Sequence, residues 1–146
     1  MSLISEADQA KLRAAFGEMT SPVRLMFFTQ TLDCETCLQT RQILDELPPL
    51  SDKISIEEVN LILEGDKAKQ YGIDRAPAIA LVGGNGHGMV DSRIRFLGTP
   101  AGYEFISLIQ AVLLVGGRPA GLSPENRARL AAVNVPVTIQ VFTTPT

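Results

Sequence analysis

The 146-residue sequence has few of the residues that hold metals or build disulfide frameworks: two cysteines, one histidine and no tryptophan. A secreted mini-protein stapled by disulfides carries more cysteines at wider spacing, so that class is excluded. A four-cysteine zinc site would need a second cysteine pair, and the single histidine, His87, cannot complete such a site. Any thiol chemistry is therefore expected from the one pair, Cys34 and Cys37.

An excess of positive charge and long apolar runs are also missing. The chain has 13 basic and 16 acidic residues, a net charge of −3 and a pI near 5.1, which leaves no basic surface for nucleic acid. No apolar run approaches the roughly 20 residues that a membrane helix needs, so no membrane span is expected. Residues 1–8 lack the basic start and apolar stretch of a secretory signal, which makes the cytoplasm the expected compartment.

The chain does have a large apolar fraction. Hydrophobic residues make up 45% and charged residues 20%, which excludes disorder and suits one ordinary domain with a buried core. Val23 to Thr29 is a nearly continuous apolar run, typical of a strand covered on both faces. The spacing of apolar residues, and the glycine and proline residues between the apolar segments, predict an α/β fold built on a single sheet. The expected elements are helix 5–19, strand 23–29, helix 34–47, strand 54–59, helix 64–71, strand 75–82, strand 92–97, helix 103–115 and helix 123–133.

The sequence Cys34-Glu35-Thr36-Cys37 follows the first strand and opens the next helix. Both thiols are expected in the first turn of that helix. There the free backbone N–H groups and the positive end of the helix dipole stabilise a thiolate, which lowers the thiol pKa below its free value of about 8.5. This placement favours redox chemistry, with Cys34 attacking a disulfide and Cys37 resolving the mixed disulfide. Two alternatives stay open: a structural or vestigial thiol pair, and half of a zinc or iron–sulfur site shared between chains.

The end of the chain repeats its first strand, because residues 21–29 and 135–143 align without gaps. We expect one unit over residues 1–120. Residues 121–146 are expected to hold a linker helix and the first strand of a second, truncated unit of a longer parent protein. An exposed apolar strand edge templates pairing. Segment 135–143 is therefore expected either to pair with a second copy, giving self-association, or to fold back on its own domain.

At this point the residues carry a family resemblance. A strand–CxxC–helix followed by a proline before the third strand resembles the thioredoxin/glutaredoxin superfamily. The sequence is most similar to the two-unit protein disulfide oxidoreductases, or glutaredoxin-like domain proteins, whose N-terminal unit it would be. The supporting stretches are Tyr71-Gly-Ile-Asp-Arg-Ala-Pro77, Arg95-Phe-Leu-Gly-Thr-Pro-Ala-Gly-Tyr-Glu-Phe105 and Val141-Phe-Thr-Thr-Pro-Thr146. Around residues 98–117 the chain also looks similar to the N-terminal domain of the flavoprotein component of alkyl hydroperoxide reductase.

The resemblance implies a thioredoxin-like fold, with a mixed central sheet flanked by helices and an extra N-terminal helix. It implies that Pro77, after Ala76, is a cis-proline beside the active disulfide. The substrate groove would be formed by Glu35, Thr36, Ala76 and Pro77, with Cys34 and Cys37 as catalytic residues. The chain departs from the family in lacking the second unit and in having Glu-Thr between its cysteines where Pro-Tyr is common.

Other candidate residues carry charge. Asp33 and Glu35 suit a helix start, but as like charges beside a thiolate they oppose its ionisation and make the pair a weaker oxidant. Glu57 and Glu58 are expected to be solvated, with one of them an alternative candidate for a buried acid that assists proton transfer. His87, in a loop with four glycines, is expected to be exposed and inert.

The leading hypothesis is a cytoplasmic thiol–disulfide oxidoreductase, a glutaredoxin-like protein-disulfide reductase acting in cell redox homeostasis. It would need no bound cofactor or metal, since the Cys34–Cys37 dithiol is itself the redox group. Its expected partners are disulfide-bearing proteins and a thioredoxin-reductase-like electron donor. The competing hypothesis is a non-catalytic docking or scaffold unit that supports a second redox unit or a peroxide-reducing partner.

Overall fold

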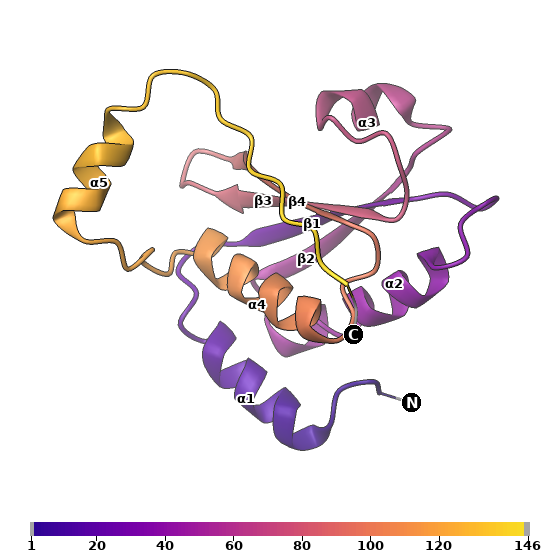
Figure 1. The fold of residues 1–146 in the computed structure, drawn as a ribbon. Helices are drawn as coiled ribbons and strands as arrows, with labels where there is room; N and C mark the ends of the chain where they lie inside the picture. Colours follow the sequence, from indigo (N-terminus) through magenta and orange to yellow (C-terminus); the bar gives the residue numbers. More distant parts are fainter. Residues whose placement is uncertain (1, 145–146) are drawn as a thin grey trace.

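The computed structural model describes residues 2–144, and its centre is a mixed four-stranded sheet (Figure 1). The strands are β1 (Val23–Thr29), β2 (Ile54–Asn60), β3 (Ala78–Gly84) and β4 (Met89–Leu97), in the spatial order β2-β1-β3-β4. β1 pairs parallel with β2 and antiparallel with β3, and β3 pairs antiparallel with β4. The helices are α1 (Glu6–Phe16), α2 (Cys37–Asp45), α3 (Gly65–Gln70), α4 (Tyr103–Val115) and α5 (Pro124–Ala131), and a 3-10 turn, η1, covers Pro48–Leu50.

Two apolar clusters lie on opposite faces of the sheet, and β1 contributes to both. Val23, Leu25 and Phe27 belong to the cluster that includes residues of α1, α2 and α4, whereas Met26 and Phe28 belong to the cluster that includes α3. Figure 1 shows α1, α2 and α4 on one side of the sheet and α3 on the other. The expected coverage of this strand on both faces, and the mixed sheet flanked by helices, are confirmed.

Several element ends differ from the sequence-based expectation, and three of the differences bear on the fold and the site. Helix 5–19 is shorter, because Gly17 is the C-cap that follows Phe16, while Ser5 is the N-cap as expected and accepts a hydrogen bond from Asp8 N–H. The third strand begins after Pro77, not at Arg75, since proline brings no N–H to a ladder. The helix after the first strand begins at Cys37, so the expectation that both thiols lie in its first turn is wrong for Cys34.

The end of the chain is exposed. α5 buries none of its residues, and every described residue from 121 to 144 is exposed. Figure 1 shows α5 apart from the sheet, with the following segment running back toward the start of α4, where the Thr143 hydroxyl donates to Glu104. Residues 135–144 form neither a helix nor the ladder that defines a strand, and Pro145 and Thr146 lie outside the described residues. The division at residue 120 and the second unit therefore remain predictions.

The exposure of the tail yields a first prediction. Deleting residues 135–146 is expected to change the free energy of unfolding by less than about 0.5 kcal/mol, because the described side chains there bury almost nothing. The shortened chain should also self-associate less, since it lacks the exposed side chains of Val137, Ile139 and Phe142. Urea denaturation and sedimentation measure the two effects. A strictly monomeric full chain whose shortened form unfolds would contradict the prediction.

Candidate functional site

The direction of the strands brings three loops to one edge of the sheet. β1 ends there and leads to Cys34. β3 runs the opposite way and starts there, with Phe28 paired to Ala78, so that Pro77 stands level with Thr29. β4 ends there as well, because Leu97 pairs with the same Ala78. The CxxC loop, the Pro77 turn and the loop that starts at Gly98 therefore meet at this edge.

Cys34 and Cys37 form a disulfide whose Cα atoms are 5.5 Å apart. Cys37 opens α2 and is only 6% exposed, whereas Cys34 lies in the preceding turn and is partly exposed. The residues between them, Glu35 and Thr36, are both exposed. A reagent from solution thus has better access to the Cys34 sulfur than to the Cys37 sulfur.

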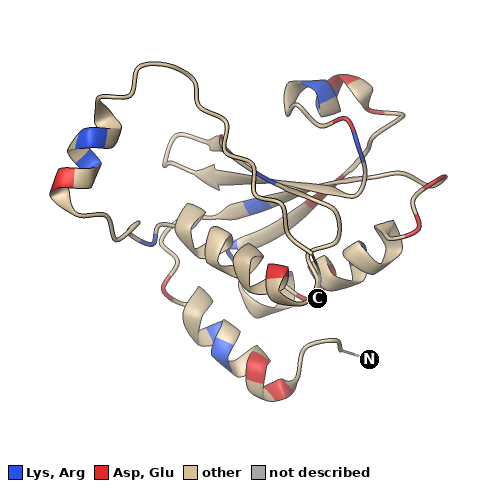
Figure 2. Cartoon of the chain, in the orientation of Figure 1, with Lys and Arg blue, Asp and Glu red and all other residues tan. Residues whose placement is uncertain are grey.

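The turn before α2 is acidic and left-handed at one residue. Asp33 has a φ of 55°, in the region that Asp tolerates better than most residues, and its carbonyl accepts a hydrogen bond from Gln30 at 3.2 Å. Asp33 and Glu35 are exposed on either side of Cys34. Figure 2 shows acidic residues in the loop leading to α2. Both charges are therefore placed to oppose a thiolate at Cys34, through solvent.

The Ala76–Pro77 peptide bond is cis, and Pro77 is buried while Ala76 is partly exposed. The Pro77 carbonyl accepts a hydrogen bond from Gly98 N–H at 2.9 Å. Gly98 has a φ of 97°, in the range that favours glycine, and this lets the chain turn out of β4 at that point. The structure thus joins the Pro77 turn to the loop between β4 and α4.

Sequence reasoning missed a polar contact that links this loop to α2. The Thr40 hydroxyl lies 2.8 Å from the Thr99 hydroxyl, and Thr99 follows Gly98 directly. The two residues are 59 positions apart, so no local pattern could have found the pair. Threonine in the second turn of the CxxC helix was the only available signal.

Glu57 and Glu58 take part in ion pairs along the outer strand of the sheet. Glu57 accepts a hydrogen bond from Lys67 and pairs with Arg24 at 3.5 Å, and Glu58 pairs with Arg41. The side chains of Glu57 and Glu58 are 33% and 42% exposed, as expected for charges in contact with solvent, and the alternative that one of them is a buried acid is wrong. The physical reason is that β2 is an edge strand. His87 is exposed in the turn between β3 and β4, as expected.

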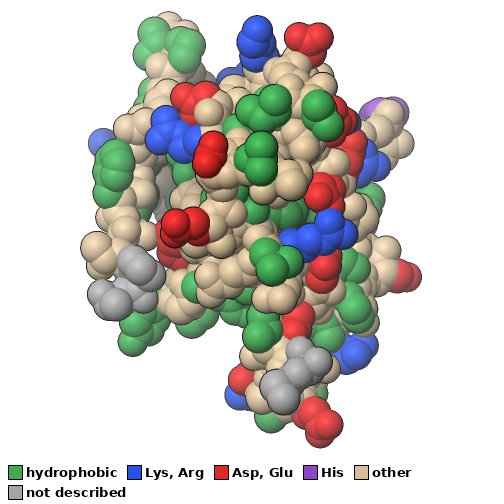
Figure 3. All heavy atoms as spheres, turned by 90° about the vertical axis from the view of Figure 1, so that its right-hand side faces the viewer, with side chains coloured by type: hydrophobic (Ala, Val, Ile, Leu, Met, Phe, Trp, Pro, Cys, Tyr) green, Lys and Arg blue, Asp and Glu red, His purple; other side chains and the backbone are tan. Residues whose placement is uncertain are grey.

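Exposed apolar side chains flank the disulfide. Leu32 and Leu38, on either side of the CxxC, are 77% and 68% exposed. Ile62 and Leu63 are 71% and 84% exposed and follow β2, whose end lies at the same sheet edge as the end of β1. Figure 3 views this edge and shows hydrophobic side chains at its surface among charged ones.

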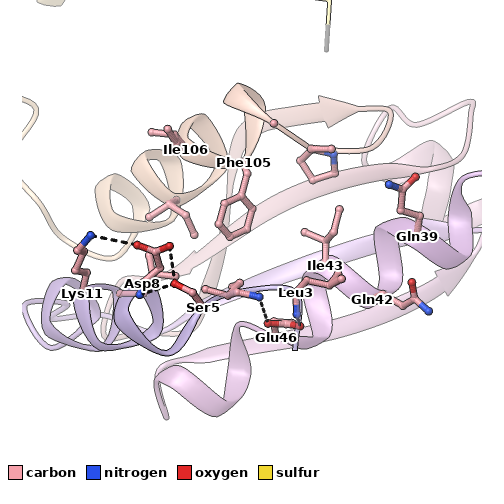
Figure 4. A pocket seen from close by; sticks show the side chains of 16 residues that line it. Leu3, Ser5, Asp8, Lys11, Gln39, Gln42, Ile43, Glu46, Phe105 and Ile106 are labelled. Atoms are coloured by element: carbon pink, nitrogen blue, oxygen red, sulfur yellow. Dashed lines mark hydrogen bonds and ion pairs between the residues drawn. The ribbon is translucent and has the colours of Figure 1, made fainter. Parts of the chain in front are cut away.

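A groove of about 720 Å³ lies between α1, α2 and α4 and is separate from the disulfide, because neither cysteine lines it (Figure 4). Its apolar wall includes Ile43, Phe105 and Ile106. At its rim, burial opposes ionisation of Glu46, but hydrogen bonds from Leu3 N–H, the Ser2 hydroxyl and Ile4 N–H hold the pKa of this carboxyl below its usual value. These contacts fasten residues 2–4 to the end of α2.

Metal ligands do not gather anywhere in the part of the chain that the structure describes. Residues 2–144 hold no group of three or more His, Cys, Asp or Glu side chains able to bind a metal. None of the helices in this range is long and apolar enough to cross a membrane.

The chain is similar in sequence to several curated proteins, although no family model matches it. It is 31% identical over 114 residues to the alkyl hydroperoxide reductase protein AhpF of Escherichia coli, covering 77% of this chain but 18% of that protein. The chain thus spans about a fifth of the length of that relative. It is 30% identical over 88 residues to a probable thioredoxin of Methanothermobacter marburgensis, covering 60% of this chain and 92% of that protein.

Solved structures share the fold. The N-terminal domain of AhpF from Enterococcus faecalis superposes with a TM-score of 0.79 at 28% identity, over 90% of this chain and 61% of that one. A protein disulfide oxidoreductase of Aeropyrum pernix superposes with a TM-score of 0.74 at 22% identity, over 88% of this chain and 54% of that one, and shows the fold alone. With its CxxC disulfide at the end of β1, this chain belongs to the thioredoxin superfamily.

Proposed function

We propose that this chain is a protein-disulfide reductase of glutaredoxin-like type, which reduces or exchanges disulfides of proteins or of a small thiol. The observation that carries the proposal is the asymmetry of the Cys34–Cys37 disulfide, with one sulfur accessible and the other buried at the start of α2. In such a pair the accessible sulfur can react with a substrate, and the buried sulfur can then resolve the mixed disulfide.

The proposed reaction starts from the dithiol. The Cys34 thiolate attacks a substrate disulfide, forms a mixed disulfide and releases one substrate thiolate. The Cys37 thiolate then attacks the Cys34 sulfur, which releases the second substrate thiolate and forms the Cys34–Cys37 disulfide. Two electrons pass to the substrate, whose two thiolates take up the two protons. The disulfide form in the structure is the product of this half-reaction.

The substrate would lie across Glu35, Thr36, Ala76 and Pro77. The exposed leucine and isoleucine side chains around the disulfide (Figure 3) support a protein substrate that presents an extended, partly apolar segment. A small thiol would cover little of that surface.

Two electrons from a donor must restore the dithiol. A reductase of the thioredoxin-reductase type is proposed as that donor, and the similarity to AhpF supports a place beside a reductase. No bound cofactor is needed in this chain, because the dithiol itself carries the electrons. The proposed compartment is the cytoplasm.

A docking or scaffold role is the second candidate. It is supported by the match to a short stretch of a much longer reductase and by the exposed apolar tail from Val135 to Phe142. In that case the two cysteines would not take part in disulfide exchange, and the chain would bind a redox partner.

Redox cycling separates the two candidates. Coupled to a thioredoxin reductase, the wild-type chain is expected to reduce a protein disulfide, and the Cys34→Ser variant to lose this activity, because it lacks the attacking thiol. The pair should equilibrate with glutathione at a potential in the roughly −200 to −300 mV range of cellular thiol systems. A wild-type pair that neither oxidises nor reduces there would favour the docking role.

Trapping tests the assignment of the two thiols. Cys37→Ser removes the resolving thiol, so the variant should accumulate a mixed disulfide between Cys34 and a substrate protein. Cys34→Ser should accumulate none, because the remaining thiol is 6% exposed in the wild-type structure. Mass spectrometry of the trapped species measures both, with urea denaturation as a control for folding. The reverse pattern would overturn the assignment.

The acids beside Cys34 are expected to tune the potential. Glu35→Gln removes a negative charge that opposes the thiolate, which stabilises the dithiol and makes the pair more oxidising. Because Glu35 is exposed, the shift in the glutathione equilibrium constant should be only roughly two- to threefold. Glu125→Gln, an exposed charge change on α5, is the matched control and should leave the constant unchanged. An equal constant for wild type and Glu35→Gln would show that the charge does not act on the thiolate.

A further inference from the structure

Thr40 is the only polar or charged side chain in residues 2–144 that is fully buried, with 0% exposure. It lies in α2, three residues after Cys37 and four after Thr36. A buried hydroxyl costs free energy unless it is hydrogen-bonded, and valine would fill the same space without that cost. The contacts of this hydroxyl are therefore informative.

The hydroxyl joins two parts of the site. The Thr36 carbonyl accepts hydrogen bonds from Thr40 N–H at 2.9 Å and from the Thr40 hydroxyl at 2.8 Å. The Thr40 hydroxyl has one proton and gives it to that carbonyl, so the Thr99 hydroxyl must be the donor in the 2.8 Å contact between the two threonines. The result is a directed chain from the Thr99 hydroxyl to the Thr40 hydroxyl and on to the Thr36 carbonyl.

That carbonyl belongs to the peptide between Thr36 and Cys37. In a trans peptide the N–H points opposite to the C=O, so fixing the Thr36 carbonyl along α2 directs Cys37 N–H out of the start of the helix. This N–H is one of the donors that a helix start leaves free, and Cys34 lies in the turn before it. Hydrogen bonds in a chain polarise one another, so the two threonine hydroxyls strengthen this donor.

The Thr99 end of this series of hydrogen bonds lies next to the Pro77 turn. Thr99 follows Gly98, whose N–H donates to the Pro77 carbonyl at 2.9 Å. The Thr40–Thr99 contact therefore connects α2, through Gly98, to the Pro77 turn. A threonine bonded only to the carbonyl four residues earlier is ordinary in a helix. The hydrogen bond between Thr40 and Thr99, which are 59 positions apart, is not explained by this local helix pattern.

We propose that Thr40 and Thr99 are a positioning pair for the disulfide exchange, which aims Cys37 N–H at the Cys34 thiolate and holds α2 against the Pro77 turn. This inference rests on the proposed function, because it assigns a role to residues that act through the Cys34–Cys37 pair. Neither threonine touches the substrate or exchanges electrons. Their effect is to stabilise the dithiol form, in which Cys34 carries negative charge.

Removing the Thr40 hydroxyl is expected to weaken that stabilisation. Thr40→Val should shift the glutathione equilibrium constant three- to tenfold toward the disulfide and raise the pKa of the Cys34 thiol, measured from the ultraviolet absorbance of the thiolate. Thr40→Ser retains the hydroxyl and should restore both quantities. Thr99→Val should shift them in the same direction by less, because Thr40 still donates to Thr36. Adding it to Thr40→Val should change the constant no further.

Two controls separate positioning from stability and from the proposed function. Thr20→Val removes a threonine hydroxyl far from the site, one that contacts the Gly116 carbonyl at 3.4 Å, and should leave the constant unchanged. Should Thr40→Val fail to fold, Thr99→Val in the partly exposed loop decides the question. Threonine variants that unfold more easily but keep the wild-type constant and thiol pKa would overturn this inference alone. A wild-type pair that does not exchange with glutathione would overturn the proposed function, and this inference with it.

Discussion

Burial of β1 on both faces is the constraint on which the arrangement of the site depends. A strand whose successive side chains enter two different apolar clusters must lie inside the sheet, with helices on either side. Such a strand is accessible to solvent only at its ends, and the CxxC lies in the loop that follows the C-terminal end of β1. The neighbours of β1 fix the rest: β3, running the opposite way, brings Pro77 to the same edge, and β4 brings Gly98 and Thr99.

The same burial decides what can stabilise charge at the disulfide. Phe27 and Phe28 are buried and occupy the end of β1 nearest the cysteines. This strand therefore offers no carboxylate close to the two thiols. The acids of β2 are at the sheet edge and engaged by Arg24, Arg41 and Lys67. Around the CxxC the structure places the backbone N–H groups at the start of α2, the two threonine hydroxyls and the exposed charges of the preceding turn.

Sequence reasoning reaches the features that short stretches of chain determine. The apolar run 23–29 and the CxxC after it predict the strand and the redox pair, and α4 has the predicted bounds because Gly102 and Gly116 flank it. Other features depend on a partner strand, on the conformation of a turn or on a distant contact, which short stretches of chain do not determine. Residues 135–143 have the composition of a strand but form no ladder in this structure, so the second unit that they would begin stays a prediction. Cys34 lies before the helix and not in it, because the last residues before a helix are free to turn. The Thr40–Thr99 contact needs the fold itself.

Dipoles and charges act on the thiolate in different ways, and the site uses both. Asp33 and Glu35 are exposed, so their repulsion of a thiolate is weakened by water and screened by salt. The Thr40 hydroxyl is buried, so its effect on the Thr36–Cys37 peptide is neither screened nor weakened in this way. A hydroxyl also does not titrate near neutral pH, whereas a buried carboxylate or amine would change its charge or carry a large desolvation cost. The attraction toward the start of α2 therefore stays constant over the pH range in which the thiol itself ionises, and the exposed acids set how far that attraction is offset.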